Sequence, residues 1–213
     1  MTRARSGLSE PPDQLLGFPE AEPIAQLHRL SEYPGTWWFA SSSPDADTGG
    51  RFDLPPPDGT CSLADSLTGA VVEKLLRSPV KVVVAERLDE LFHTVVTVRT
   101  TPPVADLTAK AATGFGLNAE IHTTLQYDRT RRWATALHRA GFRGLRYRLR
   151  GDVTSRHSGW ALFGAAGLRQ RAPRGMNAAV RSLDRDEVER ILDGLGVQVR
   201  PIPSSVAIVR PPR

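Results

Sequence analysis

The sequence contains very little cysteine and very little lysine. Cys61 is the only cysteine among the 213 residues, which excludes an internal disulfide bond and a zinc site built from clustered cysteines. A lone thiol is typical of a reducing compartment, so we expect a cytoplasmic protein. Only three of the 28 cationic residues are lysine, and the formal net charge is +5. This arginine excess is compatible with a GC-rich coding sequence and also with a phosphate-rich ligand.

Long apolar runs and the common catalytic motifs are also missing. No apolar run approaches the roughly 20 residues that cross a membrane, and no apolar segment follows the N-terminal arginines as it would in a secretory signal. The five histidines never fall at the spacing of a helical zinc pair, and HExxH, GxSxG, Walker and Rossmann patterns do not occur. We therefore expect a soluble protein with no metal site and no membrane segment.

Composition divides the chain into three regions. Residues 1–22 combine prolines with little apolar pattern, which predicts a flexible N-terminal arm. Residues 23–165 alternate apolar runs with turn signals and predict the folded domain. Residues 166–213 predict a C-terminal extension packed on that domain, with a basic, loop-like stretch and one helix. Asp184 is the expected cap of this helix and Gly194 its end.

The apolar patterns of the central region predict an α+β fold. Aromatic and β-branched residues indicate strands, whereas apolar residues on one stripe, bounded by capping signals, indicate helices. The expected strands are 37–40, 80–85, 92–98, 145–149 and 160–163, and the expected helices are 66–77 and 127–139. Several strands follow one another without strict alternation with helices, as is typical of α+β proteins.

One segment and one carboxylate are the first candidates for a binding site. The segment GGRFDLPPPDGT at 49–60 offers two glycines that let a ligand approach the backbone, and Arg51 between them and the prolines can hold a phosphate. Glu73 lies in the middle of an otherwise apolar helix. A half-buried carboxylate needs a partner or a chemical role, and a plain salt bridge or a solvated helix edge is the alternative.

At this point the sequence resembles the RES domain family, which is named after its arginine, glutamate and serine signature residues. The matching segments are LHR at 27–29, GGRF at 49–52, GTCSLAD at 59–65, VE at 72–73, WA at 133–134, LHRAGF at 137–142, GLRY at 144–147 and WALFG at 160–164. They occur in the family's order over residues 25–165, which makes the resemblance more specific than any one motif.

The resemblance implies a fold like that of ADP-ribosyltransferases, with mixed or antiparallel sheets and flanking helices. It also implies that NAD is a substrate rather than a cofactor, cleaved at the nicotinamide–ribose bond by hydrolysis or phosphorolysis. Glu73 would be the catalytic carboxylate, and Arg29 and Arg51 would hold the phosphates. Gly50 and Tyr147 complete the implied substrate-binding set.

Two signature positions depart from the family. Ser62 stands where a tyrosine normally precedes the Leu-Ala pair, and Leu149 stands where the signature serine is expected. These changes favour a noncatalytic RES-like domain that binds a nucleotide or a protein, whereas the retained arginines and Glu73 favour an enzyme. Transfer of ADP-ribose to a protein would use the same residues.

The partners implied are NAD and, for a toxin of this family, a helix-turn-helix antitoxin. The arginine-rich stretch 129–156 raises nonspecific nucleic-acid binding as a rival. Few aromatic residues interleave with these arginines, and helix and strand placement would scatter them. We therefore expect a solvated face and no direct nucleic-acid binding.

Overall fold

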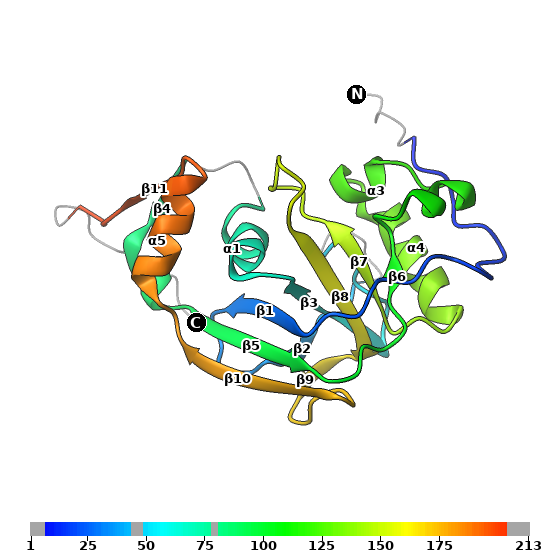
Figure 1. Cartoon of the computed structure of the whole chain (residues 1–213), viewed down its shortest axis with the longest axis horizontal. Helices are drawn as coiled ribbons and strands as arrows, with labels where there is room; N and C mark the ends of the chain where they lie inside the picture. The colour runs from blue at the N-terminus through cyan, green and yellow to red at the C-terminus, as the bar shows by residue number, and fades with distance from the viewer. Residues whose placement is uncertain (1–6, 44–48, 78–80, 204–213) are drawn as a thin grey trace.

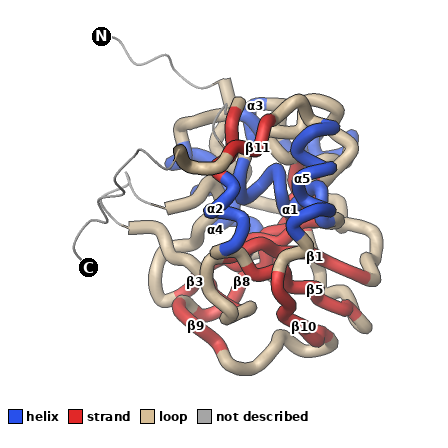
Figure 2. Tube along the Cα trace, turned by 90° about the vertical axis from the view of Figure 1, so that its left-hand side faces the viewer, coloured by secondary structure: helices blue, strands red, loops and turns tan. Residues whose placement is uncertain are grey.

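The computed structural model describes residues 7–43, 49–77 and 81–203. Figure 1 shows a central sheet with helices on one side and a short two-stranded ribbon on the other. The same division into helical and strand layers is visible from the left-hand side in Figure 2. The expected α+β class is therefore confirmed, because helices and a mixed sheet form separate layers of one fold.

The central sheet has seven strands. In spatial order they are β10 (Met176–Ser182), β5 (Phe92–Val98), β1 (Gln26–Ser31), β3 (Asp58–Ala64), β8 (Ser158–Ala165), β7 (Gly144–Arg148) and β6 (Ala105–Asp106). The β6–β7 pair is parallel and every other neighbouring pair is antiparallel. Ser62 pairs with Ala161 and Tyr147 pairs with Gly159, so β3, β8 and β7 present these residues to one another across the sheet.

The helices lie on one face of this sheet, and two further strand pairs flank it (Figure 1). The helices are α1 (Leu67–Leu75), α2 (Ala85–Asp89), η1 (Lys110–Phe115, a 3₁₀ helix), α3 (Glu120–Thr123), α4 (Tyr127–Arg139) and α5 (Arg185–Gly194). The strand pairs are β2 (Trp37–Phe39) with β9 (Gly167–Arg169), and β4 (Val82–Val84) with β11 (Gln198–Arg200). Among the described residues, no helix is long and apolar enough to cross a membrane.

Local sequence signals explain where the principal helices begin and end. The Ser66 hydroxyl accepts a hydrogen bond from the Gly69 amide at 3.0 Å and caps α1. The Asp184 carboxylate accepts one from the Glu187 amide at 3.0 Å and caps α5, as expected. Gly141, just beyond α4, takes a φ of +101°, a conformation that favours glycine and ends the helix.

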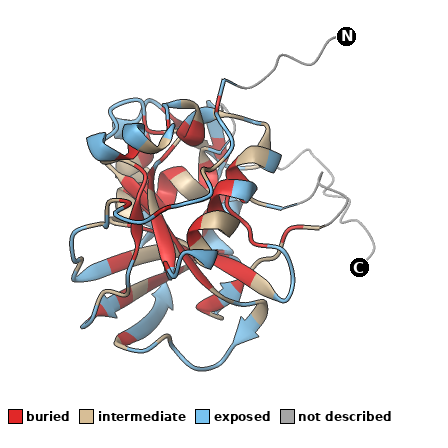
Figure 3. Cartoon of the chain, turned by 90° about the vertical axis from the view of Figure 1, so that its right-hand side faces the viewer, coloured by how far each residue is buried: buried red, intermediate tan, exposed pale blue. Residues whose placement is uncertain are grey.

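Three clusters of buried apolar residues lie against the two faces of the sheet, and Figure 3 shows that much of the sheet is buried. One cluster lies beneath α4 around Trp133, and a second lies between α1, α5 and β1. The third covers the opposite face, where β2 packs over Cys61 and Leu63 of β3. Because neighbouring residues of a strand face opposite sides of a sheet, Ser62 points toward the helices while Cys61 points away from them. This alternation decides which residues of β1 and β3 can reach the site described below.

The N-terminal segment differs from the expected flexible arm over its described part. Leu8, Leu15 and Phe18 are buried in the cluster around Trp133. The Trp133 indole donates a hydrogen bond to the Ser9 carbonyl at 2.9 Å. Isolated apolar residues between prolines carry no periodic signal, so the pattern did not reveal that they fill a groove of the domain. Residues 1–6 lie outside the described part of the chain.

The chain after residue 165 also contributes more to the sheet than expected. Where the sequence indicated a basic, loop-like stretch, the structure has β9 and then β10, and β10 pairs with β5 along its whole length. Six of the seven residues of β10 are exposed, so an edge strand of small and polar residues lacks the apolar alternation that predicts strands. The expected strand 80–85 is β4 at 82–84, and Val80 lies outside the described residues.

Candidate functional site

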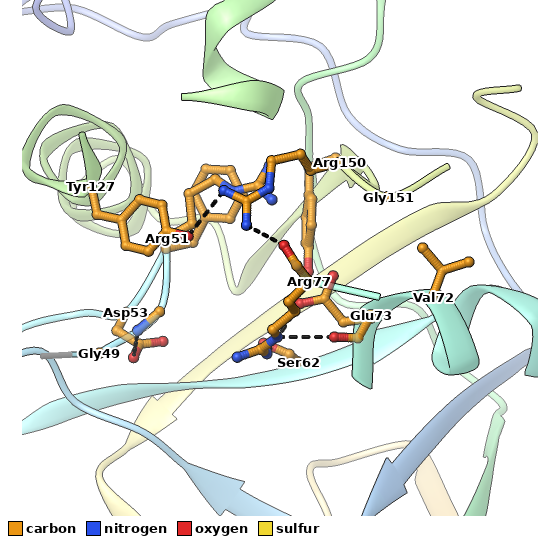
Figure 4. A pocket seen from close by; sticks show the side chains of 13 residues that line it. Gly49, Arg51, Asp53, Ser62, Val72, Glu73, Arg77, Tyr127, Arg150 and Gly151 are labelled. Atoms are coloured by element: carbon orange, nitrogen blue, oxygen red, sulfur yellow. Dashed lines mark hydrogen bonds and ion pairs between the residues drawn. The ribbon is translucent and has the colours of Figure 1, made fainter. Parts of the chain in front are cut away.

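A pocket opens on the helical face of the sheet, between α1, β3, β7 and the start of α4 (Figure 4). Its walls come from segments far apart in the sequence, which the sheet topology brings together. The lining residues are Gly49, Gly50, Arg51, Phe52, Asp53, Ser62, Val72, Glu73, Arg77, Tyr127, Tyr147, Arg150 and Gly151. Five of the residues singled out from the sequence, namely Gly50, Arg51, Ser62, Glu73 and Tyr147, are therefore neighbours in space.

Glu73 projects into this pocket from α1. Its side chain is 19% exposed, because α1 packs its apolar residues onto β1 and β3 and leaves Glu73 at the edge of that contact. The carboxylate forms an ion pair with Arg77, one helical turn later, at 3.2 Å. The salt bridge considered from the sequence is therefore present, and it lies inside the pocket rather than on a remote helix face.

Tyr147 is a buried residue of β7 that lies beside Glu73. Burial, together with the negative charge of Glu73, raises the pKa of Tyr147 well above its usual range, so the phenol stays protonated. The ring is accommodated by Gly159 on β8, where a Cβ atom would lie only 2.2 Å from a ring carbon. The glycine thus makes room for the phenol beside Glu73.

Arg51 reaches the pocket from the loop before β3. Its guanidinium lies 5.4 Å from the ring centroids of both Phe52 and Tyr147 and donates a hydrogen bond to the His122 carbonyl. Burial lowers the pKa of Arg51, although the arginine keeps its charge. Its Nε atom is buried without a hydrogen-bond partner among the described residues. A buried cation with a free donor is suited to an anionic ligand.

The loop that carries Arg51 is held in place by α4. The Thr130 hydroxyl donates to the Arg51 carbonyl at 2.5 Å, and the Arg131 guanidinium donates to the Gly50 carbonyl at 3.1 Å. Asp53 closes the loop from within by accepting from the Gly50 amide at 2.5 Å, and burial raises the pKa of this carboxyl. The two supports from α4 were not found from the sequence, because Thr130 and Arg131 lie about 80 positions from the loop along the chain.

The two diverged signature positions have different environments. Ser62 lines the pocket from β3, on the same face as Glu73. Leu149 does not line it, because its side chain is only 2% exposed and packs in the cluster around Trp133. The change at Ser62 therefore alters the pocket directly, whereas Leu149 belongs to the apolar core that supports it.

Arg29 lies on the opposite face of the sheet. Its guanidinium donates to the Thr36 carbonyl at 2.7 Å and lies 2.9 Å from the sulfur of Cys61. Cys61 and Ser62 are consecutive residues of β3, so a side chain that contacts Cys61 is separated from the Ser62 face by the sheet itself. The structure therefore does not bring Arg29 together with Arg51 and Glu73.

Three polar lining residues were not singled out from the sequence. Arg77 follows Glu73 by four positions, a spacing that could have predicted the ion pair. Arg150 donates to the Tyr127 hydroxyl at 3.3 Å and to the Arg77 carbonyl at 2.6 Å, which ties the end of β7 to the end of α1. Figure 4 shows these side chains converging on the pocket from different elements. Nothing in the local sequence of Tyr127 or Arg150 signals this meeting.

The composition of the pocket limits its chemistry. Within the described ranges, no group of three or more histidine, cysteine, aspartate or glutamate side chains could hold a metal ion. Two carboxylates line the pocket, and Asp53 accepts a hydrogen bond from the Gly50 amide. The other carboxylate, Glu73, shares the pocket with the guanidinium groups of Arg51, Arg77 and Arg150. Such a set can bind an anionic ligand and stabilise positive charge that develops next to the carboxylate.

Comparison with known proteins gives the fold and the family of the chain. No curated protein sequence matches the chain. A chain in the crystal structure of the M. tuberculosis MbcT–MbcA toxin–antitoxin complex is similar in fold, with a TM-score of 0.54 and 19% sequence identity, over 81% of this chain and 91% of that one. The sequence model of the RES domain matches residues 24–185, which include β1 to β10. The chain therefore belongs to the RES domain family.

Proposed function

We propose that this protein consumes NAD by cleaving the bond between nicotinamide and ribose. The observation that carries the proposal is the half-buried Glu73 carboxylate, which lies in one pocket with the guanidinium groups of Arg51, Arg77 and Arg150. A carboxylate can stabilise positive charge on the ribose, and guanidinium groups can bind the phosphates of NAD. The family resemblance supports the same assignment.

The chemistry follows from charge. When the bond between the ribose C1′ and the nicotinamide nitrogen breaks, its electron pair neutralises the pyridinium ring, and the ribose acquires oxocarbenium character. The negative charge of Glu73 stabilises this cation, and its oxygens can orient the ribose hydroxyls. An oxygen nucleophile, from water or from phosphate, then bonds to C1′ and releases a proton if the nucleophile was water. Arg51 binds phosphate oxygens and thereby holds the rest of the dinucleotide in place while nicotinamide leaves.

Two alternatives use the same pocket. Transfer of ADP-ribose to a protein side chain would need the same carboxylate and would differ only in the nucleophile. A noncatalytic nucleotide-binding domain is favoured by Ser62, which offers no aromatic face to the pocket. We further propose that the protein acts as a toxin with an antitoxin partner of the helix-turn-helix type. This proposal draws support from the family and from the similarity in fold to a chain of the toxin–antitoxin complex.

Product analysis tests the proposal and distinguishes the nucleophiles. The purified protein is incubated with NAD in buffers with and without phosphate, and the products are identified by mass spectrometry. Free nicotinamide with ADP-ribose indicates hydrolysis, and nicotinamide with ADP-ribose 1″-phosphate indicates phosphorolysis. A mass increase on protein indicates transfer. Intact NAD under all conditions, with a folded protein, would favour the noncatalytic alternative.

A further inference from the structure

We propose that Arg77 and Arg150 form the diphosphate-binding end of this pocket, and that a bound diphosphate draws Arg77 away from Glu73. The inference deepens the proposed function and rests on it, because the ligand concerned is a pyridine dinucleotide. Arg77, just after α1, and Arg150, just after β7, bind the phosphates together with Arg51.

Positive charge is in excess at this end of the pocket, where Arg51, Arg77 and Arg150 all line the wall. Arg150 contacts a phenol and a backbone carbonyl, and no carboxylate pairs with it among the described residues. Arg51 and Arg150 line the same pocket, and burial, together with the positive charge of Arg150, lowers the pKa of Arg51. An anion between the two guanidinium groups offsets both charges.

The second arginine expected to hold the phosphates, Arg29, lies outside the pocket. Arg29 contacts Cys61 on the far face of β3. One arginine, Arg51, remains from the pair implied by the sequence, and a diphosphate carries two phosphate groups. Arg77 and Arg150 are the other cations that line the pocket, and a hydrogen bond of 2.6 Å from Arg150 to the Arg77 carbonyl holds them together.

The contacts that Arg77 makes can be exchanged for contacts with a ligand. Its side chain is 60% exposed, and among the described residues its guanidinium hydrogen-bonds to Glu73, at the backbone carbonyl and at one carboxylate oxygen. Because the Arg77 end of this ion pair faces solvent, a diphosphate with several acceptor oxygens competes for the arginine. When Arg77 turns to the diphosphate, Glu73 loses its counter-charge. The binding of the phosphates thereby makes the carboxylate available to the ribose.

Two substrates with the same scissile bond separate these roles. NAD and nicotinamide riboside both release nicotinamide, but only NAD carries the diphosphate. We expect Arg77→Gln to lower kcat/KM for NAD about tenfold, mainly through KM, which is the lower end of the range for charged hydrogen bonds because Arg77 is exposed. For nicotinamide riboside, kcat/KM should be unchanged or higher, since the substitution frees Glu73. Arg150→Gln should lower the value for NAD in the same way.

Two further variants control for folding and for charge. Arg77→Lys keeps the charge but loses the bidentate geometry, so it should recover part of the NAD activity. Arg190→Gln removes an exposed arginine from α5 and should leave both substrates unaffected. Equal losses of Arg77→Gln on the two substrates, or no loss on NAD, would overturn the proposal. Melting temperatures of all variants identify any that fold poorly.

Binding measurements keep this inference separate from the proposed reaction. If the wild type releases no nicotinamide, the proposed function fails. Calorimetry with ADP-ribose and with adenosine then tests whether the pocket binds a diphosphate, independently of any reaction. We expect ADP-ribose to bind more tightly than adenosine, and Arg77→Gln should lower the ratio of the two affinities about tenfold. Equal affinity of the wild type for the two ligands would overturn the inference.

Discussion

The substitution Glu73→Gln separates a chemical role of this side chain from a structural one. Glutamine keeps the shape of glutamate, and its amide oxygen can still accept a hydrogen bond. The negative charge is lost, and with it the ion pair to Arg77. If Glu73 stabilises the developing cation on the ribose, the charge matters chiefly in the transition state, so the affinity for NAD should change little.

The structure sets the size of both effects. Arg77 is 60% exposed, so losing the ion pair should cost at most about 1 kcal/mol of folding free energy. For a chain of this length, that cost lowers the melting temperature by about 2–4 °C. Loss of an oriented charge at the reacting centre typically costs about 3–4 kcal/mol in the transition state, which is a hundred- to thousandfold loss of rate. Activity should therefore fall far more than stability does.

The chain offers a matched control for this experiment. Glu189 on α5 pairs with Arg185 at the same helical spacing, at 2.7 Å, and both side chains are partly exposed. Glu189→Gln should lower the melting temperature by a similar amount and leave NAD turnover intact. Melting temperature and nicotinamide release are measured on the same preparations. If Glu73→Gln keeps its activity per folded molecule, the reasoning is refuted and Glu73 is a structural ion-pair residue.

Three predictions concern the scaffold. Leu8→Ala should destabilise the fold by about 2–5 kcal/mol, because Leu8 is 1% exposed in the core, and an unchanged melting temperature would contradict the packing of the N-terminal segment. Gly159→Ala should cost about 1–3 kcal/mol and impair turnover, because its Cβ would overlap the Tyr147 ring; wild-type stability and activity would contradict this. Burial and nearby cationic side chains lower the pKa values of His93 and His122 to about 4. The unfolded chain therefore binds more protons between pH 6.5 and 4, and the free energy of unfolding should fall as the pH drops, by about 1.4 kcal/mol per pH unit for each histidine. Urea denaturation at pH 7 and pH 5 tests this, and equal values would contradict it.

Much of the fold could be predicted because its signals are local. The strand at 92–98 and the helix at 127–139 appear where their apolar patterns place them, and caps such as Ser66 and Asp184 mark helix starts within a few residues. Strand β3 escaped prediction because it contains few β-branched residues, although it lies in the middle of the sheet. Its stability comes from pairing with β1 and β8, which no local pattern reveals.

The candidate site was predictable only in part, for a similar reason. The family's sequence pattern identified Glu73, Arg51 and Tyr147, which share one pocket. Neither pattern nor spacing shows which face of a strand a residue occupies relative to a distant loop, and this geometry separates Arg29 from the pocket. The contributions of Arg77 and Arg150 depend on the turn after β7 meeting the end of α1. That contact exists only in the folded chain.

The most direct test of the central claim is the amount of nicotinamide that the wild-type protein releases from NAD. We expect many moles of nicotinamide per mole of protein, in a reaction that Glu189→Gln leaves intact and Glu73→Gln nearly abolishes. Release that stays at the level of the protein-free blank, from a folded protein that binds NAD, would contradict that claim.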